Sequence, residues 1–178
     1  QFVDWFDLDH ISRSPAQFNN EKLAWLNQQY LKVRDDRLLA EEVAPRLSSR
    51  GIGTAAGPSL EKVVALYKDR VVTLNELADA IKPFYVEVYP GAELLTQHLT
   101  DAARVALGEL RSRLETTVWE KAQLNQALKD VVAARGLKLP QLAIPLRVVL
   151  TGQPQTPSID AVLEAFGRDV VLARLARH

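Results

Sequence analysis

Apolar side chains recur at intervals of three and four residues through most of this 178-residue sequence, and this spacing constrains the fold more than any other feature. Residues three and four apart lie on the same face of an α-helix, so the pattern predicts a series of amphipathic helices. Gly and Pro interrupt the pattern often enough to end each helix after a few turns. The sequence therefore predicts an all-α protein.

Polar residues that commonly cap helices mark the expected helix starts. Asn19 or Asn20 can cap a first helix, and Asp35 or Asp36 can cap a second one that stops near Gly51. The apolar face of the first helix comprises Leu23, Leu26 and Tyr30, with Trp25 beside it.

Two residue pairs have the spacing of a capping box, namely Thr73 with Glu76 and Thr117 with Glu120. In this motif the hydroxyl accepts from the backbone amide three residues on, and the carboxylate reaches back to the cap residue. Each pair therefore predicts the start of a helix.

Three later stretches need separate interpretation. Residues 84–89 are aromatic and β-branched between two prolines, which favours a packed linker and a boundary between two subdomains. Residues 139–150 alternate as a strand would, yet Pro140 could open a helix, and composition leaves both possibilities open. Thr156 followed by Pro157 predicts an N-cap with proline at the first helical position.

Composition excludes several classes of protein. No apolar run is long enough to span a bilayer, and acidic residues near the N-terminus do not fit a signal peptide, so a cytoplasmic protein is expected. Cysteine is absent, and His10, His98 and His178 lie far apart, so no metal site is expected. The chain begins at Gln1 and has no methionine, so we expect a piece of a longer protein.

The formal net charge is zero, which alone argues against a nucleic-acid binder. Residues 1–100 hold eleven Lys/Arg and fourteen Asp/Glu, whereas residues 101–178 hold eleven against eight. The C-terminal part is therefore mildly basic.

Candidate chemistry is confined to arginine. The glycines of residues 51–58 follow no strand and have the wrong spacing for a dinucleotide loop, so an ordinary loop is expected. Trp5, Trp25 and Trp119 lie at helical spacing from apolar neighbours and are expected in the core. Arginine can grip phosphate or a base edge with its planar fork. The candidates are Arg70, Arg104, Arg111, Arg113, Arg147, Arg168 and Arg174.

Three stretches are more specific than a general helical pattern. The first comprises Phe6-Asp7-Leu8, Ser12-Arg13-Ser14-Pro15-Ala16, Phe18, Lys22-Leu23, Trp25-Leu26-Asn27 and Tyr30. The second is Arg70-Val71-Val72-Thr73-Leu74. The third comprises Gly136-Leu137-Lys138-Leu139, Pro145-Leu146-Arg147, Leu150-Thr151-Gly152, Thr156-Pro157, Leu163, Gly167 and Val171-Leu172. In this order they resemble bacterial-type glutamyl-tRNA synthetases, which are class I aminoacyl-tRNA synthetases, over nearly the whole chain.

The resemblance implies an all-helical anticodon-binding region of two small subdomains, preceded by the end of the stem-contact region. The corresponding ranges are 1–32 for the stem-contact end, 33–100 for the first helical subdomain and 101–178 for the second. In this family residues 139–150 are helical, and we adopt that expectation here.

The resemblance also implies recognition of the tRNA anticodon loop by a ligase that attaches glutamate to its tRNA with ATP. The two ATP-binding signatures of the class are absent from this sequence. The fragment is therefore expected to have no catalytic residues and no cofactor, and ATP is expected in the missing catalytic domain. The expected partner is glutamate tRNA, with glutamine tRNA left open, and neither DNA nor a membrane; a monomer is expected.

Site residues follow from the resemblance position by position. The anticodon-contacting arginine of the first helical subdomain falls on Arg70, and the arginine of the family's Pro-Leu-Arg motif falls on Arg147. The family's Thr-Pro pair falls on Thr156 and Pro157.

Two further positions complete the expected anticodon site. A basic position falls on Lys129, where relatives can have arginine, so the charge is kept without the bidentate fork. Ile159 falls where an apolar contact to a base is expected. Two alternatives remain open from the residues alone: a helical protein-interaction scaffold, which would not bind RNA, and a helical DNA binder.

Overall fold

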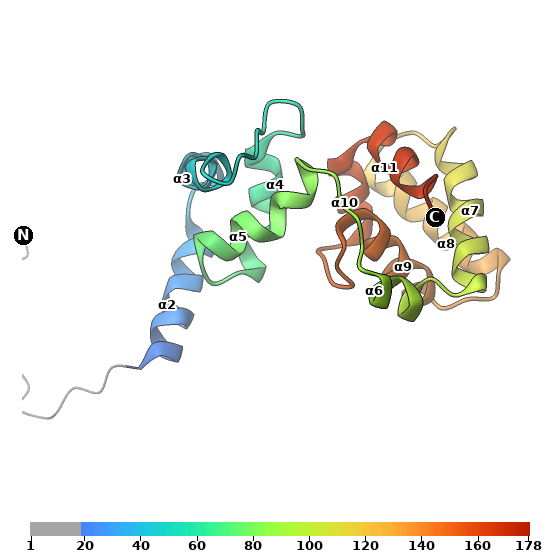
Figure 1. Cartoon of the computed structure of the whole chain (residues 1–178), viewed down its shortest axis with the longest axis horizontal. Coiled ribbons are helices and arrows are strands. Elements are labelled where there is room, and N and C mark those ends of the chain that lie inside the picture. The colour runs from blue at the N-terminus through green and yellow to red at the C-terminus, as the bar shows by residue number, and fades with distance from the viewer. Residues whose placement is uncertain (1–18) are drawn as a thin grey trace, which may run out of the picture.

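The computed structural model describes residues 19–178, and residues 1–18 lie outside the described part. In residues 19–178 every regular element is helical, which confirms the all-α prediction (Figure 1). In chain order the elements are α2 (Asn20–Val33), α3 (Asp36–Ser48), α4 (Leu60–Tyr67), η2 (Lys68–Arg70), α5 (Leu74–Ile81), η3 (Lys82–Phe84), α6 (Ala92–His98), α7 (Asp101–Leu114), α8 (Lys121–Ala134), α9 (Leu139–Thr151), α10 (Ile159–Phe166) and α11 (Arg168–Leu175).

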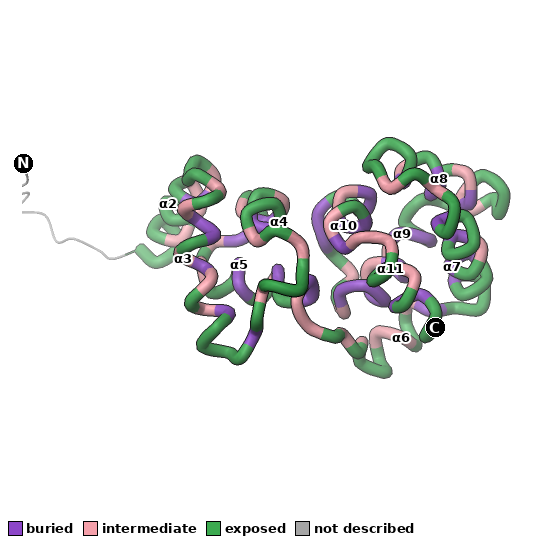
Figure 2. The backbone as a smooth tube through the Cα atoms, turned by 90° about the horizontal axis from the view of Figure 1, so that it is seen from above, coloured by how far each residue is buried: buried purple, intermediate pink, exposed green. Residues whose placement is uncertain are grey.

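The helices form two groups that meet at a narrow waist (Figure 1). In the first group α3, α4 and α5 pack on one another, and α2 touches η2. In the second group α9 is central and contacts α6, α7, α8 and α11, while α10 packs on α8 and α11. Across the waist α4 meets α10 and η3 meets α9, and Figure 2 shows buried residues in both groups.

Helix α2 presents an apolar face that residues 19–178 leave largely exposed. Leu23, Trp25, Leu26 and Tyr30 are 43–67% exposed, and Leu31 is the one buried residue of the helix. The expectation that Trp25 lies in the core is wrong within the described structure.

The same expectation of a core position applied to Trp119 and Trp5. Trp119 is half-buried, packs against the core and donates from its indole nitrogen to the Leu163 carbonyl oxygen at 3.2 Å. Trp5 lies outside the described residues.

Local cap signals correctly predict the first helix starts. The Asn19 side chain accepts from the Lys22 amide at 2.9 Å, and the Asp35 side chain accepts from the Leu38 amide at 3.1 Å. Both polar side chains satisfy amides that have no partner inside the helix.

The predicted start at Thr73 is confirmed with one difference in detail. The Thr73 hydroxyl accepts from the Glu76 amide at 3.1 Å, and α5 begins at Leu74. The Glu76 carboxylate accepts from the Val72 amide at 2.8 Å, which lies one residue before the cap residue.

The second predicted capping box, Thr117 with Glu120, is wrong. Helix α8 begins only at Lys121, and the Thr117 hydroxyl instead donates to the Arg113 carbonyl at the end of α7, at 2.8 Å. The Lys121 amide donates to the Glu164 carboxylate of α10 at 2.9 Å. The cap of α8 therefore comes from another helix, which local spacing cannot reveal.

Residues 139–150 lie in helix α9, as the family resemblance predicted. Its buried positions include Leu142, Leu146 and the consecutive Val148 and Val149, so it is buried around much of its circumference. A helix enclosed by its neighbours needs no polar face and loses the 3.6-residue apolar period. The ambiguous alternation in the sequence has this cause.

The 51–58 loop and the 84–89 linker, both predicted as irregular, are joined by one tyrosine. The Tyr85 hydroxyl donates to the Pro58 carbonyl oxygen at 3.1 Å. A Cβ atom on Gly57 would lie 2.5 Å from the Tyr85 ring, so this close approach requires glycine.

A buried arginine joins the two groups at the waist. The Arg174 guanidinium, on a residue 5% exposed, donates to the carbonyl oxygens of Pro83 at 2.8 Å and Val86 at 2.9 Å. It also donates to the Leu150 carbonyl at the end of α9, and it stacks over the Phe166 ring at 4.7 Å. Burial lowers the Arg174 pKa, and the carbonyl oxygens replace the water that the charge has lost.

Three aromatic rings continue this contact into the first group. Phe84 of η3 stacks on Phe166 with ring centroids 4.1 Å apart, and Tyr67 of α4 meets Phe84 edge-on at 5.8 Å. The row of rings crosses the waist and places the end of α4 against the second group.

Replacing Arg174 with methionine should lower the free energy of unfolding by about 3 kcal/mol, because buried carbonyl groups would lose a charged donor. Urea unfolding followed by circular dichroism measures this loss. Arg177→Met is the matched control, since Arg177 is an exposed residue that pairs with Glu87 at 2.6 Å, and it should change stability little. Equal effects of the two substitutions would contradict the assigned role of Arg174.

Candidate nucleic-acid interface

A pocket of about 420 Å³ lies at the waist, where η2, the first turns of α9 and the segment before α10 meet. We call it the waist pocket. It brings together three of the six predicted site residues. Its lining residues are Arg70, Leu139, Pro140, Ala143, Ile144, Arg147, Pro154, Gln155 and Thr156.

Arg70 and Arg147 reach the waist pocket from different groups of helices. Arg70 is exposed at the end of η2, and Arg147 is half-buried in the middle of α9. The Nε of Arg147 donates to the Thr156 hydroxyl oxygen at 3.0 Å, the one side-chain hydrogen bond of Arg147 within residues 19–178. The terminal nitrogens of Arg147 are therefore held in place and remain available to a ligand.

The electrostatics of the waist pocket favour an anion. Burial, and then the charge of Arg70, lower the pKa of Arg147, while Tyr67 acts in the opposite direction. No carboxylate within residues 19–178 forms an ion pair with Arg70 or Arg147. Two like charges without a counter-charge beside one cavity attract phosphate or electronegative base edges.

The structure contradicts the predicted helix start at Thr156. Helix α10 begins at Ile159, and Ser158 occupies the cap position. The Thr156 side chain is buried, and its hydroxyl accepts from Arg147 and donates to the Pro157 carbonyl at 3.0 Å. Thr156 therefore orients an arginine rather than capping a helix.

Pro157, Ile159 and Lys129 do not line the waist pocket. Pro157 is buried, and Ile159 is 5% exposed and belongs to the core. Lys129 is exposed on α8. The Ile159 side chain is thus not displayed to a base in this conformation.

Several other candidate arginines have structural partners. Arg168 donates to the Thr117 carbonyl and lies over the Trp119 ring at 5.6 Å. Arg174 donates to the Pro83 carbonyl oxygen at the waist, and Arg104 donates to the His178 carbonyl oxygen at 2.9 Å. The remaining candidates, Arg111 and Arg113, lie exposed on α7, where Arg113 pairs with Glu109 at 3.5 Å.

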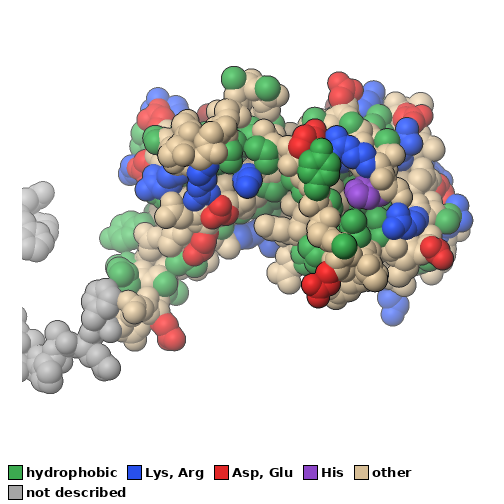
Figure 3. All heavy atoms as spheres, in the orientation of Figure 1, with side chains coloured by type: hydrophobic (Ala, Val, Ile, Leu, Met, Phe, Trp, Pro, Cys, Tyr) green, Lys and Arg blue, Asp and Glu red, His purple; other side chains and the backbone are tan. Residues whose placement is uncertain are grey.

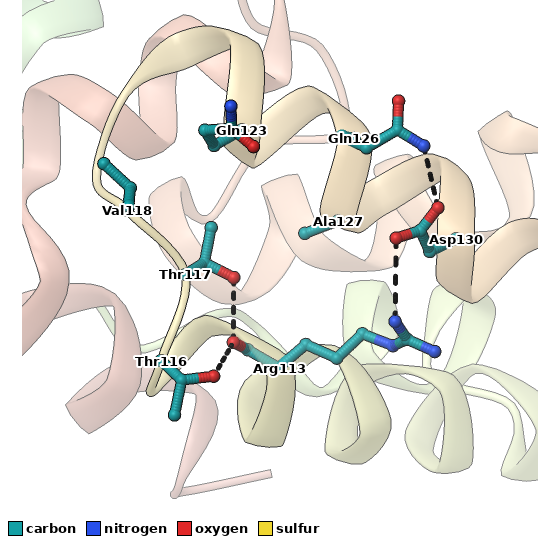
Figure 4. A pocket seen from close by; sticks show the side chains of 8 residues that line it. All are labelled: Arg113, Thr116, Thr117, Val118, Gln123, Gln126, Ala127 and Asp130. Carbon is teal, nitrogen blue, oxygen red and sulfur yellow. Dashed lines mark hydrogen bonds and ion pairs between the residues drawn. The ribbon is translucent and has the colours of Figure 1, made fainter.

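A second polar pocket, of about 300 Å³, lies between α7 and α8 (Figure 4). Its charged groups satisfy one another, because Asp130 meets Arg113 at 3.6 Å and accepts from the Gln126 amide nitrogen at 2.8 Å. This pocket therefore has no surplus of charge to attract an anion.

The wider surface shows no segregation of charge on the face drawn in Figure 3, where Lys/Arg and Asp/Glu are interspersed over both groups. No cluster of metal-ligating residues occurs in the described part of the chain. None of the described helices is both long and apolar enough to cross a membrane.

Sequence reasoning missed the apolar lining of the waist pocket and a tyrosine beside it. Leu139 and Ile144 line the cavity with apolar surface, and burial raises the pKa of the Tyr67 hydroxyl while the charges of Arg70 and Arg147 oppose that rise. The single signal in the sequence was the spacing of Tyr67, three residues before Arg70, and it carried no chemistry by itself.

The whole chain is similar to known proteins. A family model described as an anticodon binding domain matches residues 38–178. The glutamate–tRNA ligase of Azoarcus sp. (strain BH72) is 64% identical over the whole chain, and that of Aromatoleum aromaticum is 60% identical. The chain covers 38% of the length of each of these ligases.

Solved structures show the same fold. A glutamate tRNA ligase from Elizabethkingia meningosepticum, in complex with its amino acid, superposes with a TM-score of 0.85 at 21% identity. The alignment covers 97% of this chain and 34% of that one. A glutamate–tRNA synthetase from Elizabethkingia anophelis gives a TM-score of 0.80.

The fold and the match over residues 38–178 define a helical anticodon-binding domain. The chain belongs to this anticodon-binding family, and the resemblance to glutamyl-tRNA synthetases drawn from the sequence is confirmed.

Thr156→Val should lower the free energy of unfolding by about 1 kcal/mol, because it removes the hydroxyl that accepts from the half-buried Arg147. Thermal unfolding measures the change. Thr96→Val is the control, since the Thr96 hydroxyl bonds its own exposed helix at the Ala92 carbonyl, and a smaller loss is expected. An unchanged midpoint for Thr156→Val would show that the Arg147 contact contributes nothing to the fold.

Proposed function

We propose that this chain reads the tRNA anticodon loop as part of a glutamate–tRNA ligase, which attaches glutamate to its tRNA with ATP. The observation that carries the proposal is the convergence of Arg70, Arg147 and Thr156 on one pocket without a neutralising carboxylate. The family match and the names of the relatives support the same assignment.

The waist pocket has the chemistry that single-stranded RNA requires. Proteins read RNA sequence mainly in loops, whose bases can be splayed out and contacted on their edges. Leu139 and Ile144 offer apolar surface to such a base, while Arg70 and Arg147 offer charged donors. Gln155 adds an amide that can both donate and accept.

Lys129, Pro157 and Ile159 are proposed as further anticodon contacts on the family resemblance alone. Exposed Lys129 can meet a phosphate without rearrangement. Contacts by Pro157 or Ile159 require their backbone, or a shift of the segment before α10, because both side chains are buried.

We propose that residues 1–32 end a stem-contact region, and that residues 33–100 and 101–178 form two helical subdomains. The exposed apolar face of α2 supports the first part, because such a face suits contact with the rest of a longer protein. Helix α6 lies within residues 33–100 but packs on α9 as part of the second group of helices, so the proposed boundary at residue 100 does not coincide with the division between the two groups.

The catalytic part of the parent, with its ATP site, is proposed to lie outside this chain, which alone should not charge tRNA. The fragment is proposed to need no cofactor and to act as a cytoplasmic monomer. Glutamate tRNA is the proposed partner, and Arg70 is the residue proposed to decide whether glutamine tRNA is recognised as well.

The isolated chain should bind glutamate tRNA in a filter-binding assay, with an affinity that falls steeply with salt as phosphate contacts displace counterions. Arg147→Ala should weaken binding about tenfold or more and flatten the salt slope by about one unit. Arg111→Ala on α7 is the matched control, because Arg111 is exposed and does not line the waist pocket, and it should change binding little.

The alternatives give different results in the same assay. A protein-interaction scaffold binds neither tRNA nor a DNA hairpin, and a DNA binder prefers the duplex. If affinity for tRNA is the same at low and high salt, the electrostatic account is wrong. A large fall in thermal midpoint for Arg147→Ala would assign that arginine to the fold instead.

Arg70 is expected to discriminate the third anticodon base, which is C for glutamate and G for glutamine. A guanidinium can donate to the acceptors of cytosine, whereas guanine presents donors on part of the same edge. One such contact discriminates by about 1–3 kcal/mol, by analogy with bidentate readout in duplexes. In the parent ligase, Arg70→Gln should therefore lower the ratio of charging efficiencies for glutamate over glutamine tRNA. An unchanged ratio would exclude Arg70 as the reader.

A further inference from the structure

The hydroxyl of Tyr67 is a buried polar group without a partner. Tyr67 ends α4 with 4% of its surface exposed, and its oxygen makes no hydrogen bond within residues 19–178. An unpaired buried hydroxyl destabilises a fold, and phenylalanine would fill nearly the same volume without that penalty. Packing in the free protein therefore gives no reason for a tyrosine at this position.

The surroundings of Tyr67 connect it to the waist pocket. Its ring is fixed edge-on against Phe84 at 5.8 Å, and Arg70 follows three residues later at the end of the adjoining turn. Burial raises the pKa of the hydroxyl above its usual value, although the charges of Arg70 and Arg147 oppose this. The helical turns run without a break from α4 into η2, so residues 67 and 70, three apart, lie on the same side of the chain. The neutral hydroxyl can therefore be reached by the arginine side of the waist pocket.

Arg70 and Arg147 both have guanidinium N–H groups that could donate to the Tyr67 hydroxyl. Within the described residues, Arg147 uses only its Nε, toward Thr156, and Arg70 makes no side-chain hydrogen bond or ion pair. The phenolic oxygen can accept from a guanidinium that rotates toward it.

We propose that Tyr67 is a positioning residue for the arginine pair, whose hydroxyl accepts a hydrogen bond from Arg70 or Arg147 once RNA occupies the waist pocket. This inference rests on the proposed function and deepens it. In the free chain the two positive charges repel each other. An RNA anion between them removes that repulsion, and a neutral, rigidly held acceptor can then fix the direction of a guanidinium fork.

The test is Tyr67→Phe, with glutamate tRNA binding and thermal unfolding measured on the same 178-residue chain. Binding should weaken about tenfold, as expected for the loss of a hydrogen bond to a charged group. The thermal midpoint should stay the same or rise, because the substitution removes an unsatisfied buried hydroxyl. A purely structural tyrosine would not combine weaker binding with an undiminished midpoint.

Tyr85→Phe is the matched control. Tyr85 is a half-buried tyrosine whose hydroxyl is already bonded to Pro58 at 3.1 Å, and it does not line the waist pocket. Its substitution should lower the midpoint and leave tRNA affinity unchanged, which is the opposite of the Tyr67→Phe result.

Repeating Tyr67→Phe in Arg70→Ala and Arg147→Ala backgrounds, at low salt where binding is tight, tests the positioning role. The tenfold effect should shrink in at least one background, because the hydroxyl acts through that arginine. A full effect in both backgrounds would overturn the inference, as would unchanged binding by Tyr67→Phe or a fall in its midpoint. Absence of tRNA binding by the unsubstituted chain would instead refute the proposed function, and this inference with it.

Discussion

The buried guanidinium of Arg174 determines how the two groups of helices meet. It donates to Pro83 and Val86, where the chain leaves the first group, and to Leu150 at the end of α9. A charge buried in this way destabilises the fold unless carbonyl oxygens replace the lost water, so the linker and α9 must keep their relative positions. The waist pocket depends on that geometry, since one of its arginines comes from each group.

The aromatic row beside Arg174 extends this constraint to the site. Phe166 lies under the guanidinium, Phe84 stacks on Phe166, and Tyr67 closes the row next to η2. Stacked and edge-on rings hold their positions through broad apolar contact rather than through a directional bond. The end of α4, and therefore Arg70, is placed by contacts whose sequence separations are large.

The helical fold could be predicted from the sequence because apolar period and local caps are short-range signals. Asn19 and Thr73 satisfy amides three residues away, within the same helix. The cap of α8 could not be predicted, because Glu164 reaches its amide from α10. Thr156 failed as a cap for a similar reason: its hydroxyl is engaged by Arg147, nine residues earlier. Family resemblance supplied what local spacing could not, including the helical state of α9.

The distribution of charge explains how a chain of zero net charge can attract an anion. Elsewhere in residues 19–178 many cations are neutralised locally, as in the pairs Lys68–Asp36 at 2.6 Å and Arg135–Glu109 at 2.6 Å. Such pairs produce little field beyond a Debye length. Two guanidinium groups without carboxylate partners, that of Arg147 half-buried, produce a local field that the total charge does not reveal. For the proposed binding of an RNA loop, concentrating the attraction at one pocket gives selectivity without a uniformly basic surface that would hold any nucleic acid.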